Sequence, residues 1–313
     1  MSDIPTDILR EVFRQCSSSP LQAHSAWKFP WYLGQVCSHW RTLFFSMRST
    51  FWNKIVIEGM FSRAKTANVQ EIIAFFIDCT HGQPFSFTFC MGDRSGVRLH
   101  GVLADLCAHS EQWEEASIRL LSSELEHLCS VKGRLPGLKK LEIVVAWSMK
   151  HERMRSTIAG MATNVFEDAP LLTHVGLRDD HTWQFNFNWS SLTIVNFLCL
   201  EYSESILAIL RETTNLVELT LVCSLGKHLN IEGGGLIHLP RLEHLCVDWA
   251  PLLTALETPS LQQLNMMITI AVWLAQHWAS SADRKSNSIL FSFSRRWQRR
   301  SRRSCDVCPR LTD

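Results

Sequence analysis

The chain has 313 residues, of which 46% are hydrophobic and 19% are charged, and its formal net charge is +1. A disordered chain would hold fewer hydrophobic residues and more net charge, so we expect a folded protein with a sizeable core. The small net charge gives no general reason to expect a nucleic-acid or membrane partner. The best apolar run, Met266 to Leu274, is too short to span a membrane.

The cysteine content indicates a reducing compartment. Eleven cysteines, an odd number, are scattered without paired spacing. The first residues lack the basic and apolar regions of a secretory signal. We therefore expect the cysteines to be reduced and buried as small apolar side chains, and the protein to reside in the cytoplasm, the nucleus or both.

The segment from Ile4 to Trp52 predicts a small helical unit. Pro5 suits the first turn of a helix, because its missing N–H would have no partner there, and Asp7 favours the positive end of the helix. About fifty residues cannot bury a broad apolar face alone, so the unit needs a partner or a following domain. Residues with helical spacing that form this face are Ile8, Leu9, Val12 and Phe13.

These residues resemble an F-box of the type common in basidiomycete fungal proteins. The first motif, (Leu/Ile)-Pro-x-(Asp/Glu)-(Ile/Leu)-Leu-x-x-(Ile/Val)-Phe, is matched by Ile4, Pro5, Asp7, Ile8, Leu9, Val12 and Phe13. The later motif, Val-Cys-x-x-Trp-Arg with a terminal Trp, is matched by Val36, Cys37, Trp40, Arg41 and Trp52. The gap between the two motifs is longer than in many F-boxes.

The resemblance implies an all-α three-helix module over residues 1–57, which docks on the Skp-type adaptor of a cullin-RING ubiquitin ligase. It also implies a buried Trp40. The residues that would face the adaptor or form the core of the module are Ile4, Pro5, Ile8, Leu9, Val12, Phe13, Val36, Cys37 and Trp40. The alternative interpretation is an ordinary helical cap on a globular domain.

A Leu-x-x-Leu-x-Leu-like triplet recurs six times through the middle of the chain. A proline or another turn signal precedes nearly every copy, as expected when a residue without an N–H lies just before a strand. The copies are Leu138/Leu141/Ile143, Leu172/Val175/Leu177, Leu192/Val195/Phe197, Leu216/Leu219/Leu221, Leu242/Leu245/Val247 and Leu261/Leu264/Met266. A weaker copy starts at Trp113.

Stacked in register, such strands form a parallel sheet with return segments on its other side. The pattern resembles an irregular leucine-rich-repeat solenoid over residues 111–270. The expected fold class is therefore α/β, with return helices over residues 147–169 and 203–212. An unrelated α/β domain is the alternative, because leucine triplets are common.

Residues 58–110 are expected to link the two parts. We predict a helix over Val69–Phe76, a strand that begins at Pro84, and a helix over Leu99–His109. A similar succession of elements leads into the repeats in the fungal family.

The chain shows only weak candidates for catalysis or metal binding. The run Arg178-Asp179-Asp180-His181 is best interpreted as a solvated turn after a strand. Gly233-Gly234-Gly235 lacks the Lys-Ser/Thr of a phosphate loop. The three histidines His228, His238 and His244 have no recognised zinc spacing with cysteines. We expect no catalytic residue, cofactor or metal, and hence a protein that is not an enzyme.

The tail over residues 271–313 differs in charge from the rest of the chain. Residues 284–313 hold nine Lys/Arg and two Asp, which gives 9 − 2 = +7. A self-repelling, disordered end is the simplest expectation, and a coding-frame or splice shift would explain why the repeats stop. A basic tail that contacts nucleic acid is the weaker alternative.

Two functions from different classes follow. The first is a substrate-receptor subunit of a Skp-cullin-F-box ligase, which binds a protein substrate of unknown identity with the strand face opposite the leucines. By strand parity, that face presents Lys140, Glu142, His174, Arg178, Asn196, Glu218, Thr220, His244, Asp248, Gln263 and Asn265. A shift of one residue in register would invert the assignment. The second is a leucine-rich-repeat scaffold without a ligase partner.

Overall fold

The computed structural model describes residues 4–16, 20–23, 31–59, 63–91, 100–146, 164–178, 185–199, 204–223, 235–248 and 250–266. All of them belong to the first of the two units into which the chain divides, Met1–Met267. Of the helix expected over 147–169, residues 147–163 lie outside the described residues, and residues 164–168 form a turn and not a helix. The Asp179-Asp180-His181 turn, His228, Gly233-Gly234 and the basic tail also lie outside the described residues.

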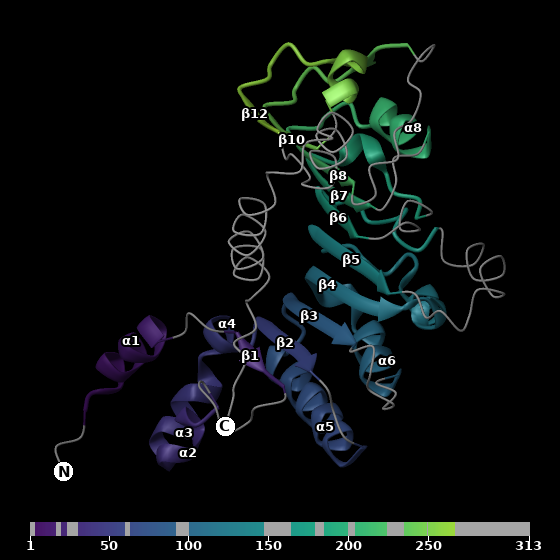
Figure 1. Cartoon of the computed structure of the whole chain (residues 1–313). Coiled ribbons are helices and arrows are strands. Elements are labelled where there is room, and N and C mark those ends of the chain that lie inside the picture. The colour runs from purple at the N-terminus through teal and green to yellow at the C-terminus, as the bar shows by residue number, and fades with distance from the viewer. Residues whose placement is uncertain are drawn as a thin grey trace, which may run out of the picture. The chain divides into compact units, whose positions relative to one another are not determined.

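A ten-stranded sheet, in which every pair of neighbours is parallel, organises this unit (Figure 1). Its strands follow one another in chain order, the arrangement expected when parallel strands are joined by right-handed crossover connections. They are β1 (Leu21–Gln22), β2 (Lys54–Gly59), β3 (Phe85–Met91), β4 (Trp113–Leu121), β5 (Lys140–Ala146), β6 (His174–Arg178), β7 (Ile194–Cys199), β8 (Glu218–Cys223), β10 (His244–Val247) and β12 (Gln263–Met266). Two short strands, β9 (Ile237–His238) and β11 (Leu256–Glu257), pair separately.

Helices precede the sheet and connect its strands. The α-helices in the described ranges are α1 (Thr6–Cys16), α2 (Leu33–Val36), α3 (Ser38–Ser46), α4 (Arg48–Phe51), α5 (Arg63–Thr80), α6 (His100–Ala108) and α8 (Glu204–Glu212). Tighter 3₁₀ turns occupy Ser110–Gln112, Ser122–Val131, Trp189–Ser191 and Ala250–Ala255. The expected mixed α/β class with a parallel sheet is therefore confirmed.

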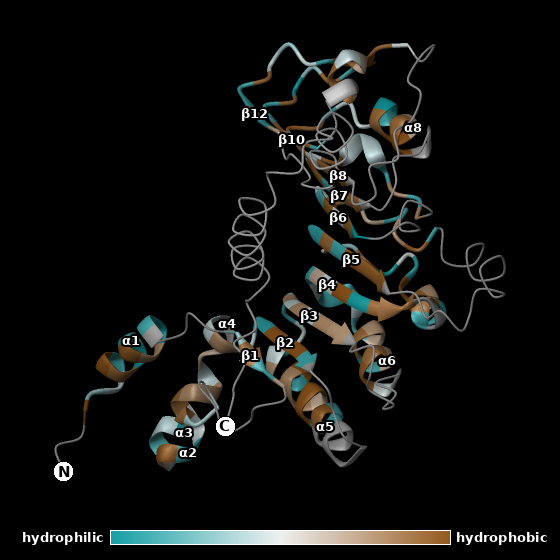
Figure 2. Ribbon diagram, in the orientation of Figure 1, coloured by the Kyte–Doolittle hydropathy of each residue, from teal (hydrophilic) through white to brown (hydrophobic). Residues whose placement is uncertain are grey.

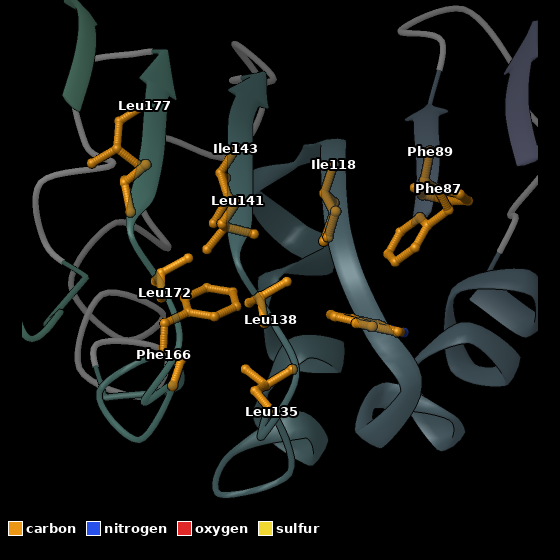
Figure 3. Packing of buried hydrophobic residues seen from close by; sticks show 14 of the residues in the cluster. Phe87, Phe89, Ile118, Leu135, Leu138, Leu141, Ile143, Phe166, Leu172 and Leu177 are labelled. Atoms are coloured by element: carbon orange, nitrogen blue, oxygen red, sulfur yellow. The ribbon is translucent and has the colours of Figure 1, made fainter. Parts of the chain in front are cut away.

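The leucine triplets supply the core of the sheet, as predicted. In the first five copies every triplet residue is buried, because residues two apart on a strand point to the same face and the first residue enters from the turn. Figure 3 shows residues of the first two copies. The weaker copy at Trp113 is also buried, together with Ala116, Ile118 and Leu120. One core runs without interruption from Leu9 to Leu252.

The sixth triplet differs from this expectation. Leu264 and Met266 lie on β12, in register with β10, but remain 45% and 40% exposed. β12 is the last strand of the described sheet, so its side chains have a neighbouring strand on one side only.

The N-terminal segment also differs from the expected all-helical module. It contains β1 and β2, which form the first two strands of the sheet and pair Leu21 with Ile55. The run Lys54-Ile-Val-Ile-Glu58 alternates, and Ile55 and Ile57 are fully buried. The sheet therefore begins inside the segment that resembles an F-box.

The linker elements form close to their predicted positions. The helix expected over Val69–Phe76 is longer, since α5 covers Arg63–Thr80, and the strand expected after Pro84 is β3. The helix expected over Leu99–His109 is α6, and the return helix expected over 203–212 is α8. Strands rich in hydrophobic residues follow one another along the sheet (Figure 2).

Aromatic rings join the helices to the first strands. Trp52 lies 5.1 Å from Phe44 and 5.5 Å from Trp31, measured between ring centroids. Trp113 lies 4.8 Å from Phe87 on the neighbouring strand. Both Trp52 and Trp113 are fully buried. The indole N–H of Trp113 donates to the Leu106 carbonyl at 3.1 Å, whereas that of Trp52 finds no acceptor in the part of the chain that the structure describes.

This difference predicts that replacing Trp113 by phenylalanine destabilises the fold more than replacing Trp52 does. Trp113→Phe removes a buried hydrogen bond as well as ring volume, whereas Trp52→Phe removes ring volume and an indole N–H without a partner. We expect Trp113→Phe to lower the free energy of unfolding by about 1 kcal/mol more than Trp52→Phe does. Equilibrium urea denaturation of the two variants measures this. Equal costs, or a larger cost at Trp52, would contradict the assigned hydrogen bonding.

Candidate functional site

Helix α1 presents a face of large hydrophobic side chains to solvent. Leu9 and Phe13 are 3% and 1% exposed, whereas Ile8 and Val12 are 57% and 46% exposed. Ile4, just before the helix, is 53% exposed. At 100° per residue, Ile8 and Val12 lie on one side of the helix and Leu9 and Phe13 lie next to them. We call Ile4, Ile8 and Val12 the α1 apolar face.

The buried side of α1 is fixed by aromatic contacts. The Phe13 ring meets the Trp40 ring edge to face at 5.0 Å and lies 6.4 Å from Phe51. Trp40 is half-buried and not buried as the resemblance implied, because its ring packs at the margin of the core. The α1 apolar face is therefore held outward by the packing of the adjacent side of the same helix.

The remaining side of α1 is charged. Arg10 pairs with Asp7 at 2.7 Å, and Arg14 pairs with Glu11. The pKa of Glu11 is lowered, chiefly because Gln15 donates a hydrogen bond to its carboxylate. Desolvation opposes this effect, and the charge and hydrogen bond of Arg14 add to the lowering. The helix thus has three distinct sides: buried, apolar and exposed, and charged.

The second motif of the F-box resemblance lies on α2 and α3. Cys37 precedes α3, and the backbone N–H of Trp40 donates to its Sγ at 3.5 Å. The Arg41 guanidinium donates to the Gly34 carbonyl at 2.7 Å, which ties α3 to α2. Pro5 and Cys37 are exposed, and Val36 is 55% exposed.

The side of the sheet opposite the core is lined mainly by polar side chains, and we call it the polar face. The strands are in register, so these side chains form rows across the sheet. One row runs Lys54, Ser86, Glu115, Lys140, His174, Ile194, Glu218, His244 and Gln263. The next runs Val56, Thr88, Ser117, Glu142, Gly176, Asn196, Thr220, Cys246 and Asn265.

A hydrogen-bonded network occupies the middle of the polar face. Glu142 accepts from Lys140 at 2.9 Å and from the Ser117 hydroxyl at 3.3 Å. His174 Nε2 lies 3.4 Å from the Asn196 amide nitrogen. Gly176 permits this arrangement, since a Cβ there would lie 3.1 Å from Glu142 Cγ.

The network shifts the titration of two of its members. Burial raises the pKa of the Glu142 carboxyl, but the hydrogen bond and charge of Lys140, with help from Ser117 and His174, outweigh it, so the net pKa is lowered. Burial lowers the pKa of His174, and the Lys140 charge lowers it further, against the opposing charges of Glu142, Glu218 and Glu115. The two shifts thus favour the ionised form of Glu142 and the neutral form of His174.

Two depressions on the polar face are bordered by residues that the structure describes. The first, about 120 Å³, lies over β2 to β5 and is bordered by Lys54, Ser86, Thr88, Glu115, Ser117, Lys140 and Glu142. The second, about 320 Å³, lies over β8, β10 and β12 and is bordered by Glu218, Thr220, His244, Cys246, Gln263 and Asn265. Both are open to solvent and lined mainly by hydrogen-bonding groups.

The structure places most of the residues that strand parity predicted in the two rows of the polar face. Nine of them lie in the two rows or at their margins, bordering a depression or the central network: Lys140, Glu142, His174, Asn196, Glu218, Thr220, His244, Gln263 and Asn265. Arg178 and Asp248 come at the carboxyl ends of β6 and β10. Sequence reasoning missed Lys54, Ser86, Thr88 and Ser117, although the alternation in Lys54–Gly59, Phe85–Met91 and Trp113–Leu121 carries that signal.

The cysteines were expected to be buried as small apolar side chains, but most of those described are at least partly exposed. Among those in the described ranges, Cys107 is buried and Cys37 is exposed, while Cys79, Cys90, Cys129 and Cys246 are half-buried. Burial raises the pKa of Cys107 to about 11, against weaker effects of Ser130 and Arg134, so this thiol stays protonated at neutral pH.

Within the described ranges, no three His, Cys, Asp or Glu side chains gather closely enough to hold a metal ion. None of the helices described is both long and apolar enough to cross a membrane. No protein-family model, curated protein or solved structure matches the chain.

The lowered pKa of His174 predicts a pH dependence of stability. Its ordinary pKa is 6.5, so as the pH falls through that value the unfolded chain takes up a proton before the folded one does. The free energy of unfolding then decreases. Between about pH 7.5 and pH 5.5, the free energy of unfolding should decrease more in the wild-type protein than in His174→Gln. Urea denaturation at both pH values measures the two decreases. The lowered pKa of Glu142 acts only below its ordinary value of 4.5 and leaves this comparison unaffected. Equal losses in both proteins would rule out the proposed state of His174.

Proposed function

We propose that the chain is a substrate-receptor subunit of a Skp-cullin-F-box type ubiquitin ligase. In this role the α1 apolar face docks on the Skp-type adaptor, which in turn binds a cullin, and the polar face of the sheet binds a protein substrate. The observation that carries the proposal is the outward orientation of Ile4, Ile8 and Val12 on a helix whose adjacent side is anchored by Leu9 and Phe13.

The exposure of this face supports docking on a partner. Large aliphatic side chains that are about half exposed leave apolar surface in water, and each gains on the order of 1 kcal/mol or more when a partner covers it. The residues that match the F-box motif fall into two groups in the structure. Leu9 and Phe13 hold the helix, while Ile4, Ile8 and Val12 are available to a partner.

The mechanism we propose is positional and needs no catalytic group on this chain. By holding the adaptor at one surface and the substrate at another, the chain raises the effective concentration of the substrate near the charged conjugating enzyme. The polar face suits the substrate side of this arrangement, because half-exposed hydrogen-bonding groups on a regular sheet can select a partner without burying a large apolar area.

A scaffold without a ligase partner remains the alternative function. In that case the N-terminal helices only cap the sheet, and their exposed side chains have no specific partner. The two functions differ in one measurable property, which is capture of the adaptor through α1.

The test is co-purification of the full chain with the Skp-type adaptor. Ile8→Glu/Val12→Glu places two carboxylates on the α1 apolar face, and we expect capture of the adaptor to fall by more than about tenfold, because central apolar contacts dominate most interfaces. The thermal midpoint should stay within a few degrees of wild type, since both side chains are exposed. Leu9 is not a suitable target because it is buried, so a charge there would test folding.

The matched control is Arg10→Glu, which puts the same carboxylate about 200° away around the helix from Ile8. It should leave capture of the adaptor unchanged. Failure of the wild-type chain to capture the adaptor would exclude the ligase function and favour the scaffold. Equal loss in the control and the double variant would show that α1 does not dock through its apolar face.

A further inference from the structure

The two depressions on the polar face differ in charge balance. In the first, each cation has its own anion: Lys54 lies 3.8 Å from Glu115, and Lys140 lies 2.9 Å from Glu142. A charged ligand would have to compete with these pairs. The second depression contains the Glu218 carboxylate and no lysine or arginine among the residues that line it.

Glu218 is therefore the charge available to a ligand on this part of the polar face. Its side chain is exposed, and it makes no ion pair with the residues that the structure describes. Around it lie further groups that can accept hydrogen bonds: the Thr220 hydroxyl, the amide oxygens of Gln263 and Asn265, and the His244 ring.

An apolar edge adjoins this acceptor-rich depression. Ile194 on β7 is the direct register partner of Glu218 and is half-buried on the polar face. Long basic side chains bury their methylene stems along apolar surface while the charged end reaches a polar group. Ile194 next to Glu218 provides this combination on two neighbouring strands.

The size of the second depression also fits a large side chain. Its volume of about 320 Å³ is that of several waters, whereas the first holds about 120 Å³. An acidic side chain in this depression would place its carboxylate next to that of Glu218, and the two negative charges would repel each other. An apolar side chain would displace water from Glu218 without giving the carboxylate another hydrogen-bond partner.

We propose that the depression over β8, β10 and β12 binds a lysine or arginine side chain from an exposed segment of the partner protein, with Glu218 as the counter-ion. This rests on the proposed role of the polar face as the substrate-binding surface, and it names the chemistry of the substrate. The amides of Gln263 and Asn265 and the hydroxyl of Thr220 accept the remaining N–H groups, and the stem of the basic side chain lies along Ile194.

The test is binding of the full chain to an array of random peptides of about seven residues, long enough to span several strands when extended. Peptides bound by the wild-type chain should be enriched in lysine or arginine relative to the array. The selected basic peptides should bind Glu218→Gln about ten- to a hundredfold more weakly, which is the usual effect of losing a charged hydrogen-bond partner. Glu218→Lys should reverse the preference and enrich acidic peptides.

Glu126→Gln is the matched control, because it makes the same chemical change at an exposed position on a connecting 3₁₀ turn. It should keep the wild-type preference. Absence of bound peptides, enrichment of acidic or neutral peptides by the wild-type chain, or an unchanged preference in Glu218→Gln would each overturn the proposal.

The Ile8→Glu/Val12→Glu variant should also keep the preference for basic peptides. Capture of the adaptor and selection of peptides are then separate readouts. If the site for a basic side chain exists, a variant that no longer captures the adaptor still selects basic peptides. If the chain does not select basic peptides, the result for adaptor capture is unaffected.

Discussion

In-register stacking of parallel strands is the constraint on which the rest of this structure depends. Each strand is too short to bury its leucines alone, so it must pair with a neighbour that buries the same positions. The backbone N–H groups that enter successive strands show this directly. Those of Thr193 and Ile194 donate to the Thr173 carbonyl, and those of Val217 and Glu218 donate to the Thr193 carbonyl one strand later. Once this register is set, the inner face must be apolar and the outer face becomes free to vary.

The same register creates interactions that no local pattern contains. Lys54 on β2 reaches across Ser86 on β3 to Glu115 on β4, because the three occupy one row. Ser86 is small enough to let the long side chains on either side approach each other. In the middle of the sheet, Gly176 leaves room for Glu142, since a Cβ there would lie 3.1 Å from Glu142 Cγ. Small residues on the polar face therefore help to set where its charged side chains lie.

The predictable part of this fold is the part with a strong period. The leucine triplets predicted the positions and the inward faces of β5, β6, β7, β8 and β10, since buried residues two apart in a strand are visible in the sequence. The helices α1 and α8 were predictable for the same reason, from apolar residues three and four apart. The candidate residues on the outer face follow from strand parity alone, provided that the register is right.

The remaining features depend on neighbours that are distant in the sequence. The two residues of β1 carry no period, so they become a strand only through pairing with β2. Exposure of Leu264 and Met266 follows from the position of β12 at the end of the described sheet, although their pattern matches that of buried copies. The half-burial of Trp40 depends on where α1 lies against α3. A sequence motif names the residues but does not fix how deeply each one packs.

The connection between the two proposed surfaces is the last consequence of the strand stacking. A positional mechanism works only when the geometry lets both partners engage at once. Here the residues that resemble an F-box are not a separate bundle, because β1 and β2 belong to the same sheet that carries the polar face. The Ala23 N–H donates to the Val56 carbonyl, and the core that holds Phe13 continues to Leu252. The surface formed by α1 and the surface formed by the strands are thus supported by one core. A destabilising change in that core should impair both together, whereas substitutions on either surface should impair only one.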